Sequence, residues 1–137
     1  MPSVEDRFAI SELLNQMAYY YDEGHLDDLA ACFAEDAIMS MQIAGGDMVG
    51  PFEGRDSIME LYRGAKSSQN DVRRHDFTNI MFDASGESLA LTAYLTLFAT
   101  ENAETKLLTT GVYRDQVGQI DGEWQSTRRH IDLDSAY

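Results

Sequence analysis

The sequence predicts an α+β domain in which helices in the N-terminal half come before a run of long antiparallel strands. Apolar residues recur at helical spacing over residues 4–33, and the spacing changes to alternation after Asp36. A further helical stretch follows near Arg55, and alternating stretches of ten or more residues, separated by short turns, fill the chain from residue 73 onward. Helices placed before and among the early strands, with a meander behind them, are typical of α+β domains.

Composition indicates one globular domain, residues 1–137, without membrane or nucleic-acid partners. The chain has 10 Lys and Arg against 24 Asp and Glu, a formal net charge of −14, which disfavours binding to nucleic acids and anionic membranes. The N-terminus lacks the apolar core of a signal peptide, and the longest apolar run, 89–99, is too short to span a bilayer. A single cysteine, Cys32, excludes an intrachain disulfide and is compatible with a reducing cytoplasm, where we expect the protein.

The first helix is expected from about Val4 to about Asp22. Ser3 and Asp6 form a candidate capping box at its start, and Gly24 is placed to end it in a left-handed conformation. The apolar face of this helix comprises Ile10, Leu13, Leu14, Met17 and Tyr21. Asp22 therefore lies at the negative end of the helix dipole, which costs up to about 1 kcal/mol unless a cationic or hydrogen-bond-donating partner offsets it.

The next elements are short. A second helix is expected from Leu26 to Phe33, and a strand at 38–43 turns into a returning strand at 48–53, whose Pro51 favours a sheet edge. A third helix then starts near Arg55. Four strands complete the meander, at residues 73–83, 88–100, 105–117 and 124–133.

Both faces of the strand at 88–100 carry apolar side chains. One parity holds Leu89, Leu91, Ala93, Leu95 and Leu97, and the other holds Ala90, Tyr94 and Phe98. The helices can cover only one of these faces. A second copy of the chain is the obvious cover for the other, so the sequence predicts a homodimer or a higher homo-oligomer.

His75 is the candidate catalytic base. Alternation along the strand at 73–83 places it on one face with Phe77, Asn79 and Met81, so that it is half sunk in an apolar environment, and we expect it to be the partner of Asp22. A lone histidine on an apolar face is more often a satisfied core residue than a catalyst. His25, in a turn between helices, and His130, in the last strand, rank lower as candidates.

Other kinds of catalytic site lack their motifs in this sequence. No His-x-His or Glu-x-x-His spacing indicates a metal, no glycine-rich loop stands at a strand–helix junction, and no Gly-x-Ser-x-Gly elbow occurs. We therefore expect neither a metal nor a nucleotide cofactor.

The whole chain resembles the SnoaL-like branch of the nuclear transport factor two-like superfamily. The resemblance rests on the helix ending in Tyr-Tyr-Asp at 20–22, residues 27–37, residues 52–58, residues 74–79 and the closing strand with Trp124. It implies a curved antiparallel sheet wrapped around three helices as a cone-shaped α+β barrel with a deep internal pocket. In the related scytalone dehydratase, hexachlorocyclohexane dehydrochlorinase and bile-acid dehydratase, which are cofactor-free lyases, an Asp and a His form a dyad at the positions of Asp22 and His75.

The resemblance implies a lyase of the dehydratase or dehydrohalogenase type that acts on a small hydrophobic molecule, with cyclic and polyketide-like compounds as candidates. Asp22 would orient His75, and His75 would take a proton from carbon. An isomerase or cyclase with the same dyad, and a non-catalytic binding or dimerisation module, remain as alternatives. Many relatives carry a tyrosine where this chain has Met17, so an acid partner has to come from elsewhere. Candidate substrate-binding residues are Tyr21, Tyr62, Phe77, Asn79, Tyr94 and Arg128.

Overall fold

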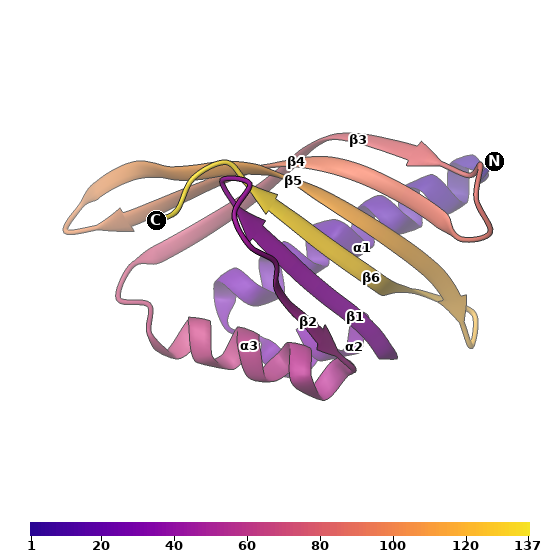
Figure 1. Cartoon of the computed structure of the whole chain (residues 1–137), viewed down its shortest axis with the longest axis horizontal. Coiled ribbons are helices and arrows are strands. Elements are labelled where there is room, and N and C mark those ends of the chain that lie inside the picture. Colours follow the sequence, from indigo (N-terminus) through magenta and orange to yellow (C-terminus); the bar gives the residue numbers. More distant parts are fainter.

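A curved six-stranded sheet arches over three helices, which lie on its concave side (Figure 1). The structure is a computed structural model that describes residues 1–137. In chain order the elements are α1 (Val4–Glu23), α2 (Leu26–Ala31), β1 (Phe33–Ile43), β2 (Val49–Glu53), α3 (Arg55–Ser67), β3 (Val72–Asp83), β4 (Leu89–Glu101), β5 (Glu104–Ile120) and β6 (Glu123–Leu133). The α+β class and the meander from β3 to β6 are confirmed.

The strand order in the sheet is β2-β1-β6-β5-β4-β3, and the sheet is open because its edge strands β2 and β3 do not pair. All neighbouring strands are antiparallel except β1 and β6, which run parallel. The sheet is therefore mixed, and the barrel suggested by the resemblance is not closed. The parallel pair joins the first strand to the last, and no local sequence signal reports such a pairing.

The ends of α1 form as its sequence predicts. The Ser3 side chain accepts a hydrogen bond from the Asp6 backbone at 3.0 Å, and the Asp6 carboxylate accepts one from the Ser3 backbone at 3.2 Å. Gly24 ends the helix with φ +78°, a conformation that glycine adopts at little cost. This stop leaves Asp22 in the last turn, on the side that faces β3.

The second helix is shorter than its apolar spacing suggests. It ends at Ala31, and β1 begins at Phe33, five residues before the predicted strand. The reason is tertiary: Phe33 pairs with Ser126 of β6, and the Ser126 backbone N–H donates to the Cys32 carbonyl at 2.8 Å. Sheet hydrogen bonds thus take over a stretch whose local pattern favours a helix.

A bulge in β3 reverses the predicted facing of its second half. Two residues, Asn79 and Ile80, stand opposite one residue of β4, and Asn79 has a positive φ of 55°. Ile80 then packs against the core, while Met81 is 67% exposed. The prediction that Asn79 and Met81 share a face with His75 is therefore wrong.

The core lies between the helices and the concave face of the sheet. Leu91, Leu95 and Leu97 of β4 belong to the same buried cluster as Leu14 and Met17 of α1. The other parity of β4 faces outward, as expected, and leaves Tyr94 55% exposed. None of the helices combines the length and the apolar character that crossing a membrane requires.

Candidate active site

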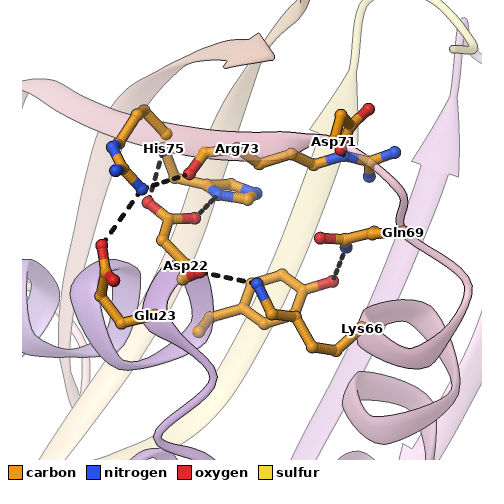
Figure 2. Close-up of polar contacts among 9 residues, drawn as sticks. Asp22, Glu23, Lys66, Gln69, Asp71, Arg73 and His75 are labelled. Atoms are coloured by element: carbon orange, nitrogen blue, oxygen red, sulfur yellow. Dashed lines mark hydrogen bonds and ion pairs between the residues drawn. The ribbon is translucent and has the colours of Figure 1, made fainter. Parts of the chain in front are cut away.

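Asp22 and His75 lie against each other at the junction of α1 and β3 (Figure 2). Asp22 Oδ1 is 2.5 Å from His75 Nδ1, and Asp22 Oδ2 accepts a hydrogen bond from the backbone N–H of His75 at 2.9 Å. Both carboxylate oxygens are therefore engaged by one residue. The two side chains are 6% and 8% exposed, so the pair is shielded from bulk water.

Neighbouring groups stabilise the end of α1 around this pair. Lys66 Nζ, on α3, donates to the backbone carbonyl of Asp22 at 2.6 Å, and Glu23 pairs with Arg74 at 3.1 Å (Figure 2). A cation at a helix C-terminus satisfies a free carbonyl and opposes the negative end of the dipole. The cost of Asp22 at this position is thus offset by Lys66 as well as by His75.

The contact with Asp22 fixes the chemistry of the His75 ring. An ionised carboxylate only accepts hydrogen bonds, so Nδ1 carries the proton and Nε2 keeps its lone pair. His75 Nε2 forms no hydrogen bond within the protein. It is also not fully enclosed by protein atoms, so it contacts open space. In Figure 2 this nitrogen lies on the side of the ring away from Asp22. It is therefore free to accept a proton.

The His75 side chain borders an apolar cavity of about 230 Å³ between α1, α3 and the concave face of the sheet. Eleven of its twelve lining residues are hydrophobic, and His75 is the exception. The wall includes Tyr21, Tyr62 and Ala65 from the helices and Met39, Met41 and Tyr113 from the strands. An apolar cavity of about 150 Å³ is enough to bind benzene. At about 230 Å³ this cavity exceeds that volume, so a small ring compound matches it in size.

Tyr21 and Tyr62 form an aromatic wall beside His75. The Tyr21 ring centroid lies 5.3 Å from that of His75 and 4.7 Å from that of Tyr62, and the Tyr21 hydroxyl accepts a hydrogen bond from Gln69 at 3.1 Å. Burial raises the pKa of both phenols above the usual value, so both are neutral near pH 7. The structure thus places these two candidates at the cavity.

The remaining sequence candidates do not line this cavity. Asn79 lies exposed at the β3 bulge, and Tyr94 and Arg128 lie exposed on the outer face of the sheet. Phe77 does face inward, but its ring contacts Tyr113 at a centroid distance of 4.6 Å and borders a separate shallow pocket beside Asp22 and His75. The expectation that Asn79, Tyr94 and Arg128 contact a ligand in the cavity is corrected for this reason.

Comparison of the sequence with family models shows the family of this chain. The family model for the SnoaL-like domain matches residues 2–130. The chain belongs to the SnoaL-like family. No curated protein matches its sequence.

Solved structures similar to this SnoaL-like chain share its fold over nearly the whole length. Aln2 from a Streptomyces species superposes with a TM-score of 0.82 at 22% identity, covering 98% of this chain and 94% of Aln2. A Catenulispora acidiphila protein solved in complex with S-DNPA has a TM-score of 0.82 at 20% identity, with 96% of each chain covered. A candidate scytalone dehydratase from Novosphingobium aromaticivorans has a TM-score of 0.75 at 24% identity, covering 95% of this chain and 85% of its own.

Sequence reasoning missed three residues of this SnoaL-like domain at the cavity or directly behind it. Tyr113 lines the cavity, and Arg129 and Asp115 form a buried ion pair next to it. A signal was present, because Asp115 alternates with the apolar Tyr113 and Val117, and Arg129 alternates with Ile131 and Leu133. A charged residue on the apolar face of a strand predicts a buried charge that has a partner.

The other histidines of the SnoaL-like domain lie outside the cavity. The His25 ring contacts Tyr19 at a centroid distance of 5.9 Å. His130 is on the outer face, with Nδ1 at 2.8 Å from Ser40 Oγ and Nε2 at 2.9 Å from Asp132. No group of three or more His, Cys, Asp or Glu side chains is arranged to hold a metal ion.

Proposed function

We propose that this SnoaL-like protein is a cofactor-free lyase for a small hydrophobic molecule, with Asp22 orienting His75 and His75 Nε2 acting as the general base. The observation that carries the proposal is the double contact of Asp22 with His75 at the edge of an apolar cavity. A base held in one tautomer, shielded from water and facing a ligand-sized space, is suited to abstract a proton from carbon.

In the proposed reaction, Nε2 takes a proton from a carbon next to a carbonyl group. The electrons of the C–H bond form a carbon–carbon double bond, and a hydroxide or halide leaves the next carbon with its bonding pair. Proton transfer of this kind contributes about 10²- to 10⁴-fold to a rate, and positioning in the cavity has to supply the rest. The likeness to a candidate scytalone dehydratase and to a ligand-bound relative supports a small-molecule substrate.

An isomerase or cyclase is the second candidate. It would use the same dyad and return the proton to another carbon in place of expelling a leaving group. Apart from His75, the cavity is lined by hydrophobic residues only. Because none of these carries a charge that could assist the departure of an anion, the lining favours the isomerase or cyclase.

A bicyclic ketone, 2-tetralone, provides a test of the shared first step. We expect the protein to catalyse the exchange of the α-hydrogens of 2-tetralone with deuterium from heavy water, and NMR measures this exchange. The His75→Ala variant should lose this activity by at least about 10²-fold. The matched variant His25→Ala, which changes a histidine outside the cavity, should retain it. Equal exchange by wild type and His75→Ala would favour a non-catalytic binding module.

We further propose that two copies associate through the outer face of the sheet and that the protein acts in the cytoplasm. That face exposes Tyr94, and Val112 lies directly opposite it on β5. Its charged residues are of both signs, including Arg114 and Asp132, which pair at 2.8 Å. In a chain with a net charge of −14, a face of mixed charge is where two copies repel each other least.

A further inference from the structure

Arg129 and Asp115 form an ion pair that is almost fully buried between β5 and β6. The two residues are paired directly across the strands, and Arg129 Nε and Nη2 lie 2.8 to 3.3 Å from the Asp115 carboxylate. Their side chains are 3% and 0% exposed. Taking two charges out of water is costly, and a buried pair of this kind contributes little net stability compared with apolar side chains. The pair therefore calls for an explanation other than stability.

The two charges face different environments. The Arg129 guanidinium carbon lies 4.4 Å from the centroid of the Tyr113 ring and 5.6 Å from that of Phe77. Asp115, in contrast, borders a groove that opens elsewhere on the surface. The positive member of the pair is thus directed toward the aromatic wall of the cavity, and the negative member lies behind it. A cation over an aromatic face is attracted by the ring quadrupole, and this attraction holds the Tyr113 ring against Arg129.

The hydroxyl group of Tyr113 is available to a ligand. It forms no hydrogen bond within the protein. A fully enclosed hydroxyl without a partner occurs only at Ser126, so the Tyr113 hydroxyl is not fully enclosed. The Tyr113 hydroxyl is therefore in contact with open space, and its side chain lines the same cavity as His75. Burial raises the pKa of Tyr113 well above its usual value, and the nearby Arg129 charge opposes that rise. The group stays protonated and is a hydrogen-bond donor.

We propose that Tyr113 is the hydrogen-bond donor that complements His75, with its O–H directed to the substrate oxygen that becomes negative, and that Arg129, held by Asp115, positions Tyr113. The inference rests on the proposed function and adds the group that stabilises the carbonyl oxygen of its substrate. When Nε2 removes the proton, the electrons of the C–H bond move into the enolate, and the negative charge gathers on the former carbonyl oxygen. The Tyr113 O–H stabilises that charge without transferring its own proton.

Binding of 4-nitrophenolate tests the donor independently of turnover, because this anion carries its charge on an oxygen as an enolate does. We expect wild type to bind 4-nitrophenolate at least about 10-fold more tightly than Tyr113→Phe. Both proteins should bind the uncharged 4-nitroanisole equally, because the substitution removes one oxygen and keeps the ring. The matched variant Tyr20→Phe, outside the cavity, should bind both probes as wild type does.

A double variant tests the positioning residue without leaving a buried charge alone. Replacing the pair by apolar side chains, Arg129→Met with Asp115→Leu, should preserve 4-nitroanisole affinity and reduce the preference for 4-nitrophenolate over 4-nitroanisole. A purely structural ion pair would change both affinities together or neither. An unchanged preference in this variant overturns the role of Arg129.

Kinetics complete the test. For deuterium exchange into 2-tetralone, Tyr113→Phe should lower kcat by about 10²- to 10³-fold with little change in KM. Equal affinity of wild type and Tyr113→Phe for 4-nitrophenolate overturns the donor role, whatever the exchange rates are. If wild type favours 4-nitrophenolate as expected but His75→Ala exchanges as fast as wild type, the oxyanion site stands and the proposed lyase function fails.

Discussion

Asp22 binds His75 twice, once through the imidazole Nδ1 at 2.5 Å and once through the backbone N–H at 2.9 Å. The second bond ties the carboxylate to the strand itself, so the position of the imidazole depends on the packing of α1 against β3 and not on side-chain rotamers alone. An apolar cavity begins at the same ring. Orientation of the base is therefore a property of the fold, and this relationship underlies the first prediction.

Replacing Asp22 with asparagine should reverse the tautomer of His75 while keeping the shape of the site. The amide nitrogen of Asp22→Asn can donate to Nδ1, which would leave the proton on Nε2 and remove the base. We expect deuterium exchange into 2-tetralone to fall by about 10²- to 10⁴-fold. Glu23→Gln, which neutralises the adjacent carboxylate at the same helix end, should leave the rate unchanged. Exchange in Asp22→Asn close to the wild-type rate would contradict the assigned role.

The outer face of the sheet should carry the subunit contact. Tyr94→Glu places a charge on that face, opposite Val112, and should convert a dimer into a monomer as measured by light scattering in solution. Tyr19→Glu makes the same change at an exposed tyrosine of α1 and should leave the mass at two chains. A monomeric wild type would rule out the proposed association.

Two glycine-to-alanine changes should have opposite effects on stability. Gly24 ends α1 at φ +78°, so Gly24→Ala should lower the free energy of unfolding by about 1–2 kcal/mol. Gly64 lies inside α3, and a methyl group there meets no atom within 4 Å, so Gly64→Ala should raise it by about 0.5–1 kcal/mol. Urea unfolding measures both, and changes of the same sign would contradict the assigned backbone roles.

Alkaline pH should reveal the burial of Cys32. Burial raises the pKa of this thiol to about 11 in the folded protein, from its usual 9. Because the pKa of the thiol is higher in the folded protein, the protonated thiol contributes to stability below pH 9, the pKa in the unfolded chain. That contribution is lost as the pH rises from 9 to 11. The free energy of unfolding of wild type should therefore fall by up to ~3 kcal/mol relative to Cys32→Ala over this range. Tyrosines ionise in both proteins, so the difference isolates the thiol, and a constant difference would refute its burial.

Much of this architecture can be predicted from local patterns. The capping box at Ser3, the stop at Gly24 and the alternation in β4 each depend on neighbours within a few residues, and all three appear in the structure. The contact of Asp22 with His75 was expected from a charge at a helix end and from a family resemblance. Local sequence patterns alone left His75 open as an ordinary core residue.

Other features depended on distant partners. The pairing of β1 with β6 placed Phe33, the last residue of the predicted helix, at the start of a strand, and the bulge at Asn79 sent Met81 outward. Tyr94 and Arg128 lie outside because the helices cover only the concave face. Tyr113 and Arg129 became visible as neighbours only when β5 and β6 were placed side by side.

By itself, the sequence determined most of the helices and strands, where α1 ends, that a carboxylate lies at that helix end, and that an imidazole shares a strand face with apolar residues. These features arise from hydrogen bonding and apolar spacing over a few residues. The tertiary structure decided which side chains meet in the cavity and which face outward. That outcome depends on strand register and on a single extra residue in β3, and a shift of one residue sends every following side chain to the opposite face.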